Sequence, residues 1–203
     1  VGQRLLNELR GVPAIRWEFE QPAKKNITHS RSFGYLLTRK EDIAEALSNY
    51  AANVAEKLRA QRSHCRSLNV FIQTNPHRIE RPQYLRSIDL QLASSSNATP
   101  ELIKYALKGL DLIFKDGFEY MKAGIIASDL ISDRVVQKNL FDMRDDVKNA
   151  ELMAAMDKVN KQLGKDVVRM AVQGFTRSYK LRADHLSKKY TTDINQVLSI
   201  NNK

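Results

Sequence analysis

The chain has 203 residues, of which 42% are hydrophobic and 28% are charged. Its 8 Gly, 5 Pro and single Cys exclude collagen-like and disulfide-scaffold proteins, and its apolar content is sufficient for a hydrophobic core. The 33 Lys and Arg against 23 Asp and Glu leave a net charge of +10, which favours a polyanion such as nucleic acid as partner.

The sequence also bears on where the protein acts. No run of about 18 apolar residues occurs, so we expect no transmembrane segment and no membrane partner. No signal sequence opens the chain, and Cys65 alone cannot form an internal disulfide. These features predict a cytoplasmic protein. The chain starts at Val1 without an initiator Met, which indicates a fragment.

Basic residues gather in two zones. Residues 24–40 carry five basic residues and no acid, and residues 165–189 carry seven basic residues against Asp166 and Asp184. A single Lys or Arg usually only solvates a surface. An acid-free basic stretch within a patterned segment is harder to explain in that way, so the two zones predict two contact surfaces.

The first third of the chain predicts a helix, a strand and a long helix. Residues 1–9 have helical apolar spacing, ended by Gly11 and Pro13, and a linker follows to residue 23. Residues 27–33 alternate loosely, as an exposed strand does, and Gly34 is expected to end them. Thr38 and Glu41 have the spacing of a capping box for a helix of roughly 20 residues.

The middle of the chain continues with two strands, a helix and a strand. Residues 68–74 are rich in β-formers, and residues 88–92 alternate as a half-buried strand does. Thr99 is expected to cap a helix that has Pro100 in its first turn and runs towards Gly117. Residues 120–130 then predict the last strand.

This order of elements predicts an α+β fold of two split βαβ units, the ferredoxin-like arrangement. Four antiparallel strands would form one sheet with two helices on one face, and the other face would stay bare. The fold hosts many functions and identifies none of them.

The composition of the sequence changes after residue 130. Residues 132–146 are polar and rich in Asp, a helix is expected over residues 150–163, and residues 167–172 could form a strand. We therefore predict four parts: a helix and linker (residues 1–23), a sheet domain (24–131), a tether (132–148) and a small helical or mixed module (149–203).

Signatures of catalysis are missing from the sequence. There is no Walker loop or dinucleotide fingerprint, and His64 with Cys65 does not give the spacing of a zinc site. Asp145 and Asp146 fall in the tether and do not suggest paired metal ions. We therefore expect a binding module without catalytic residues, metal or cofactor.

Two motifs suggest binding. Residues 25–34 place Lys25, Ser30, Arg31 and Ser32 on one basic strand, where hydroxyls, backbone N–H groups and charge suit phosphates, although an ordinary surface strand can look the same. In the tether, Gln137 is followed by Leu140 and Phe141. Two apolar side chains beside an amide suit docking into the clefts of a partner, but they could equally pack on their own domain.

Short segments occur along the chain in an order typical of one family. They are Leu9-Arg10-Gly11 with Pro13, Ser30-Arg31-Ser32-Phe33-Gly34, Tyr50-Ala51-Ala52, Lys122-Ala123-Gly124, the pentapeptide 137–141, Met153-Ala154-Ala155-Met156-Asp157, and Leu186-Ser187 before Tyr190-Thr191-Thr192. With these segments the chain resembles the C-terminal half of the UmuC family, the bacterial Y-family (translesion) DNA polymerases. The resemblance runs over essentially the whole chain.

The resemblance implies a role for each part: the end of the thumb, the DNA-binding little finger, a tether with a sliding-clamp motif, and the C-terminal module of UmuC proteins. It implies DNA-backbone contacts at Ser30, Arg31, Ser32 and Lys122. Charge alone adds Lys25, Arg66, Arg78 and Arg86. The clamp-binding residues would be Gln137, Leu140 and Phe141; Lys138 departs from the motif, which often has Leu or Ser there.

The resemblance also implies what the whole protein does. It would be an error-prone DNA polymerase of the SOS response to DNA damage, located in the cytoplasm at the nucleoid. Its catalytic carboxylates and Mg²⁺ would belong to a palm preceding Val1, so this fragment is expected to be inactive alone and to need no cofactor. Expected partners are damaged or primer–template DNA, the sliding clamp, a UmuD′-like accessory subunit and the recombinase filament.

An alternative is an RNA-binding or protein-interaction module of the same fold, without a polymerase role. An RNA-recognition version should carry aromatics within a Lys/Arg-Gly-Phe/Tyr signature on a central strand, and residues 68–74 lack it.

Overall fold

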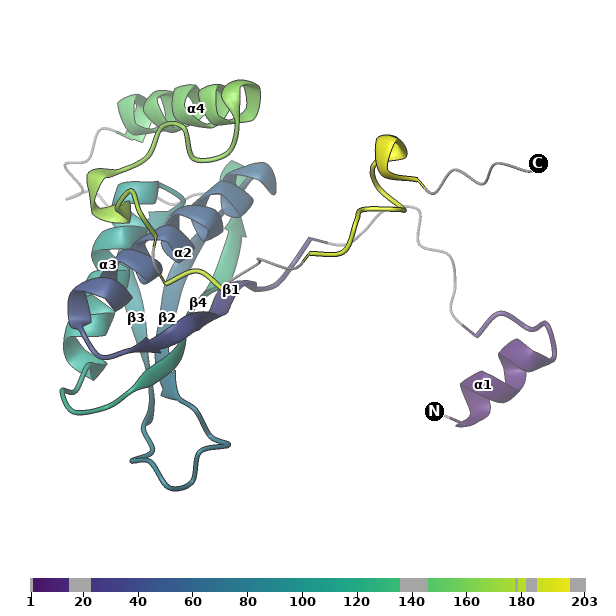
Figure 1. The fold of residues 1–203 in the computed structure, drawn as a ribbon. Coiled ribbons are helices and arrows are strands. Elements are labelled where there is room, and N and C mark those ends of the chain that lie inside the picture. The colour runs from purple at the N-terminus through teal and green to yellow at the C-terminus, as the bar shows by residue number, and fades with distance from the viewer. Residues whose placement is uncertain (1, 15–22, 136–145, 178, 182–185, 198–203) are drawn as a thin grey trace.

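A computed structural model describes residues 2–14, 23–135, 146–177, 179–181 and 186–197 (Figure 1). In chain order the elements are α1 (Gly2–Leu9), β1 (Ile27–Leu37), α2 (Lys40–Ala60), β2 (Ser63–Thr74), β3 (Leu85–Ser96), α3 (Thr99–Ile113), β4 (Tyr120–Ser132) and α4 (Asp146–Leu163). Three short 3₁₀ turns complete them: η1 (Asp133–Val135), η2 (Ala171–Gln173) and η3 (Ile194–Gln196).

The four strands form one antiparallel sheet in the order β1-β4-β2-β3. β4 therefore lies between β1 and β2, and β2 lies between β3 and β4, which interleaves two βαβ units. Helices α2 and α3 pack side by side on one face of this sheet (Figure 1). The predicted α+β fold with two split βαβ units is confirmed. We call the opposite face, which none of the described helices covers, the open face.

The core fills the space between the sheet and the two helices. Helix α2 buries Ile43, Leu47, Val54 and Leu58 completely, and their spacing of four and seven residues puts them on one side of the helix. From the sheet, Ala123 and Ile125 of β4 are also fully buried and lie two residues apart, as inward positions of a strand must. The buried positions of the helix, which repeat every 3.6 residues, and those of the strand, which repeat every second residue, therefore face each other in one core.

Both predicted helix caps are wrong. Helix α2 has Arg39 at its N-cap position and α3 has Ala98 there, and neither side chain makes a capping hydrogen bond. Thr99 is already inside α3, where its buried hydroxyl accepts a hydrogen bond from Arg59 Nη1 at 3.1 Å. A tertiary contact therefore uses the hydroxyl that local reasoning assigned to the helix end.

Gly34 does not end β1, which continues to Leu37. Its backbone N–H donates to the carbonyl oxygen of Tyr179 at 2.9 Å, so a segment far along the chain pairs with this outer strand. A Cβ at position 34 would overlap the carbonyl oxygen of Lys180. Glycine is needed here because another backbone approaches closely, and not because of a turn.

The C-terminal module packs against α2 and β1, and Figure 1 shows its chain crossing α2 on the way to β1. Met153 of α4 is buried, and Arg59 of α2 holds Asp157 of α4 with Nε–Oδ2 and Nη2–Oδ1 distances of 2.6 and 2.7 Å. Residues 167–172, interpreted from the sequence as a possible strand, form no strand and end in η2. Of the residues that follow, Tyr179 is buried by packing on the sheet domain, whereas Phe175 and Lys180 are exposed.

Candidate nucleic-acid interface

The open face gathers three of the predicted DNA-binding residues. Strand pairing aligns Ser30 with Gly124 and Ser32 with Lys122 on the neighbouring strands β1 and β4. Residues two apart on a strand point to the same side, so Ser30 and Ser32 share one face of β1. Two hydroxyls and one ammonium group thus stand together at the β1–β4 side of the sheet.

Gly124 is buried at the centre of this face, where its lack of a side chain leaves room for its neighbours. A Cβ built there would overlap the side chain of Ser30 and the ring of Phe71, which is the partner of Gly124 on β2. The ring of Phe71 therefore lies over the glycine. A glycine inside a strand often marks such a close approach. Gly124 and Phe71 therefore belong to this surface, although the sequence-based prediction did not include them among the site residues.

Charge on the open face is unequal. The acid of this face on β3, Asp89, accepts a hydrogen bond from Asn69 Nδ2 at 3.0 Å, whereas Lys122 lies between Ser32 and Gln73 in the strand register. The amide beside Asp89 reduces the effect of its charge locally. The β1–β4 side is thus the side better suited to an anion.

Arg31 and Arg86 belong to the other side of the sheet. They stand at the two ends of one row across the strands, in which Arg31 pairs with Ala123, Ala123 with Ile72, and Ile72 with Arg86. Ala123 and Ile72 are completely buried beneath the helices. Both arginines are exposed because they lie on the outer strands, but the alternation directs them away from the open face.

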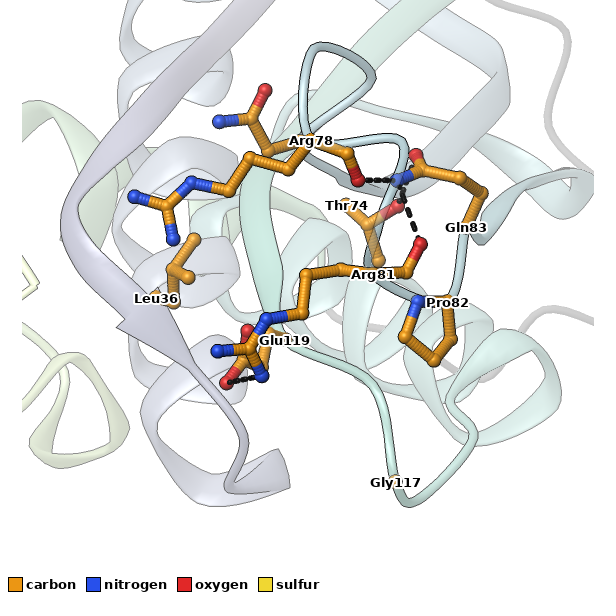
Figure 2. A pocket seen from close by; sticks show the side chains of 9 residues that line it. Leu36, Thr74, Arg78, Arg81, Pro82, Gln83, Gly117 and Glu119 are labelled. Carbon is orange, nitrogen blue, oxygen red and sulfur yellow. Dashed lines mark hydrogen bonds and ion pairs between the residues drawn. The ribbon is translucent and has the colours of Figure 1, made fainter.

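The β2–β3 loop presents Arg78 and Arg81 at the end of the sheet where β1 finishes. Figure 2 shows both side chains extending from the loop toward Leu36 and Glu119. Gln83 Nε2 donates to the carbonyl oxygens of Arg78 at 2.8 Å and Arg81 at 3.1 Å, which holds the loop in shape. These residues line a cavity of about 200 Å³.

The two loop arginines differ in their partners. Arg81 contacts the carboxylate of Glu119 at 3.4 Å. Within the described ranges, no ion pair involves Arg78. Arg78, the arginine predicted from charge, is thus the more available of the two for an anion, while the contribution of Arg81 to the loop was missed because its partner is distant in sequence.

Lys25 and Arg66 are exposed away from this loop. Gln61 fixes the chain just before Lys25, because its side-chain amide both donates to and accepts from the backbone of Lys24 at 3.1 Å. Arg66 lies on β2 between Cys65 and Ser67, where the pairing with β3 shifts register. The predicted clamp-binding residues Gln137, Leu140 and Phe141 lie outside the described residues.

The groups that could act on a substrate by chemistry are few. In the part of the chain that the structure describes, no three His, Cys, Asp or Glu side chains are placed to hold a metal ion. Cys65 is completely buried, and burial raises the pKa of its thiol to about 12, so the thiolate nucleophile is absent at neutral pH. Among the described helices, none is long and apolar enough to cross a lipid bilayer.

Family models match most of the chain. Residues 24–140 match the impB/mucB/samB family C-terminal domain, and residues 150–200 match a domain of unknown function, DUF4113. The chain therefore belongs to the impB/mucB/samB family, and the predicted relation to UmuC proteins is confirmed.

Curated relatives agree with this assignment. Protein UmuC of Salmonella typhimurium is 36% identical over 199 residues, which are 98% of this chain and 47% of that protein. Protein MucB of Escherichia coli is 35% identical and covers 94% of this chain and 45% of its own length. DNA polymerase IV of Clostridium acetobutylicum is 30% identical over 73% of this chain and 36% of its own. The chain spans about half the length of the UmuC and MucB relatives.

Two solved structures of Y-family polymerases match more distantly. An insertion ternary complex of Dbh DNA polymerase has a TM-score of 0.42 and 13% identity, and covers 64% of this chain and 35% of that one. A Dbh–Dpo4 chimera has a TM-score of 0.44 and 14% identity over the same shares.

Proposed function

We propose that this chain is the DNA-gripping and tethering region of a UmuC-like translesion DNA polymerase. In this proposal residues 24–131 are the little finger that holds primer–template DNA, residues 132–148 are a tether to the sliding clamp, and residues 149–203 are the C-terminal module. Residues 1–23 are the end of the thumb and a linker. The observation that carries the proposal is the alignment of Ser30 and Ser32 with Gly124 and Lys122 on the open face.

This alignment supports recognition of the backbone without readout of sequence. Hydroxyls and an ammonium group make the contacts that proteins direct at phosphate oxygens. Discrimination between bases needs groups that make two hydrogen bonds to one base, as Arg does to guanine and Asn to adenine, aimed at base edges in a groove. The β1–β4 side of the open face offers Lys122 and two serines instead, so the grip is expected to be indifferent to sequence.

The grip can be tested by the salt dependence of binding. We expect a fluorescein-labelled primer–template to bind the chain with an affinity that falls as salt rises. Each phosphate contact contributes a slope of about 0.9 in a plot of log affinity against log salt concentration. Lys122→Gln should reduce the slope by about that amount for every DNA sequence tried. Lys104→Gln, at an exposed site on α3, is the control of equal charge.

Two results would overturn the grip. One is an affinity that does not change between low and moderate salt. The other is an equal effect of Lys122→Gln and Lys104→Gln. If an RNA duplex displaces the labelled primer–template at a lower concentration than unlabelled DNA does, the alternative RNA-binding module is favoured instead.

The clamp tether rests on the pentapeptide 137–141 alone. We expect Leu140→Ala with Phe141→Ala to abolish co-elution of the chain with sliding clamp, because two apolar anchors are lost together. Val135→Ala, at an exposed apolar residue just before the motif, should leave co-elution unchanged. Retained co-elution of the double variant would remove the tether from the proposal.

The activity of the whole protein belongs to the proposal as well. In this proposal, error-prone synthesis in the SOS response uses carboxylates and Mg²⁺ of a palm outside the 203 residues, as the family relation implies. UmuD′-like and recombinase partners and a place at the nucleoid follow from the same family relation. Nucleotide incorporation by the purified chain, with Mg²⁺ supplied, would contradict the assignment of the chemistry to another segment.

A further inference from the structure

The basic residues of the C-terminal module divide into two groups by their contacts. Arg177 Nη1 contacts Asp166 Oδ2 at 2.5 Å, and both side chains are largely buried. The guanidinium of Arg169 lies over the ring of Phe175, 5.0 Å from its centroid. These arginines serve the module itself. Lys165 and Lys180 are exposed, and no ion pair within the described part of the chain involves either of them.

Lys180 is fixed at the outer edge of β1. The residue before it, Tyr179, accepts the hydrogen bond from Gly34, and the ring of Tyr179 meets the rings of Phe33 and Tyr50 edge to face at 6.3 and 6.4 Å. Gly34 lies two residues beyond Ser32, in the part of β1 where the pairing with β4 shifts register. The segment thus adds an exposed lysine beside β1, close in the chain to the serines of the open face.

Lys165 lines a cavity together with Asn53 and Glu56 of α2, which places it near Lys57 of the same helix, and its charge acts on His29. Burial first, and then the charges of Lys57, Arg31 and Lys165, lower the pKa of His29 from 6.5 to about 4. Arg31 and Lys57 are exposed on β1 and α2, and the described residues give neither of them an ion pair. Three segments of the chain therefore bring positive charge to one place.

The acidic residues nearby are Asp166, Glu45 and the exposed Glu56, which lines a cavity together with Lys165. Asp166 pairs with Arg177, and the carboxylate of Glu45 lies partly buried beneath the backbone of Gly174. We define the β1-edge cluster as Arg31, Lys57, Lys165 and Lys180. The four cations outnumber the two acids beside them that are unpaired within the described residues, Glu45 and Glu56, and this excess of positive charge attracts a polyanion.

We propose that the C-terminal module provides a second contact to the nucleic-acid backbone, in which the β1-edge cluster extends the phosphate-binding surface from the open face around the outer edge of β1. The inference rests on the proposed DNA grip and adds to it a role for residues 165–181. The two basic zones of the sequence then form one continuous surface, because the module is docked beside β1.

The test measures binding of the fluorescein-labelled primer–template to the full 203-residue chain. Replacing both Lys165 and Lys180 with Gln should lower the salt slope by about 1.8, twice the contribution of a single phosphate contact. Replacing both with Arg should keep the slope. The matched control is Lys104→Gln with Lys108→Gln, which removes the same charge from exposed sites on α3.

A second variant tests the docking. Gly34→Ala should displace the segment at Lys180, because the new Cβ would overlap its carbonyl oxygen, and should therefore lower the slope although no charge is removed. Circular dichroism confirms that each variant is folded.

The outcomes separate this inference from the proposed function. Equal slopes for the Lys165/Lys180 and Lys104/Lys108 double variants, together with a reduced slope for Lys122→Gln, would overturn the module contact and leave the DNA grip intact. If the unmodified chain does not bind the primer–template, both proposals fail. The inference is supported if the Lys165/Lys180 double variant has a reduced slope and the Lys104/Lys108 double variant does not.

Discussion

Asn49 of α2 and Gln173 of η2, 124 positions apart, are joined by two hydrogen bonds. Asn49 Nδ2 donates to the carbonyl oxygen of Gln173 at 2.7 Å, and Gln173 Nε2 donates to Asn49 Oδ1 at 3.3 Å. Gln173 Oε1 also accepts from the backbone of Met170 at 2.9 Å. Both side chains are buried, so this polar pair determines where the C-terminal module sits on the sheet domain.

Asn49→Ala is therefore expected to destabilise the docked chain. The substitution leaves the Gln173 carbonyl and amide buried without partners, which costs about 1–3 kcal/mol in the free energy of unfolding. Denaturant unfolding of the full chain measures the loss. Asn53→Ala is the control, because the amide of Asn53 donates only to the carbonyl of Asn49 within the same helix, at 2.7 Å. Equal losses for the two variants would contradict the role of the Asn49–Gln173 pair.

The Arg59 guanidinium makes a second attachment of the module. Besides its two bonds to Asp157, its Nη1 donates to the carbonyl oxygen of Asn97 at 2.7 Å and to Thr99. Arg59→Lys keeps the charge but loses the fork, the pair of parallel hydrogen bonds from the guanidinium to Asp157. We therefore expect the free energy of unfolding to fall by about 1–3 kcal/mol, as for other charged hydrogen bonds. Hydrogen exchange in α4 should accelerate.

A surface ion pair provides the comparison for Arg59. Lys40 and Asp111 approach to 2.9 Å with side chains that are 41% and 63% exposed, against 15% and 33% for Arg59 and Asp157. Lys40→Gln should cost no more than about 1 kcal/mol and leave exchange in α4 unchanged. Unchanged exchange in Arg59→Lys would show that the fork does not hold the helix.

Most elements of the sheet domain could be predicted from the sequence because their apolar periodicity is strong. Helix α2 and strand β3 follow from spacing that local sequence displays directly. The ends of the elements depended on distant contacts: Thr99 bonds Arg59, and Gly34 pairs with Tyr179. A residue whose partner is 40 or more positions away gives no local signal of its role.

The candidate site was predictable in part for a similar reason. Alternation along β1 already separates Ser30 and Ser32 from Arg31. Which residues of β4 and β3 stand beside them depends on strand register, and this register aligned Lys122 with Ser32 and placed Arg86 in the row of Arg31. Charge alone could not distinguish the two faces of the sheet.

Gly174 should resist substitution more than a comparable glycine. Its φ of +63° is a conformation that L side chains rarely adopt, and a Cβ there would also overlap the Glu45 carboxylate. Gly117 has a φ of +86° but open space around it, so Gly117→Ala meets the backbone cost alone, about 1–2 kcal/mol. We expect Gly174→Ala to exceed that loss and to speed proteolysis within residues 165–181. Equal losses in denaturant unfolding would show that the module tolerates the side chain.

His29 should make stability depend on pH on the acid side. Its ring lies 5.0 Å from that of Tyr50, and burial, followed by Lys57, Arg31 and Lys165, lowers its pKa from 6.5 to about 4. Between these two values the unfolded chain binds a proton that the folded chain excludes. The contribution of neutral His29 is thus complete above pH 6.5 and is lost as the pH falls towards 4.

His29→Phe keeps an aromatic ring beside Tyr50 and removes the titrating group. We expect the free energy of unfolding, measured with urea at pH 7 and at pH 5, to fall less in this variant than in the unmodified chain. His77→Phe, at an exposed position in the β2–β3 loop, should keep the full decrease between the two pH values. If His29→Phe loses as much stability as the unmodified chain between pH 7 and 5, the acid sensitivity arises from another group, and the cations around His29 do not act on its protonation.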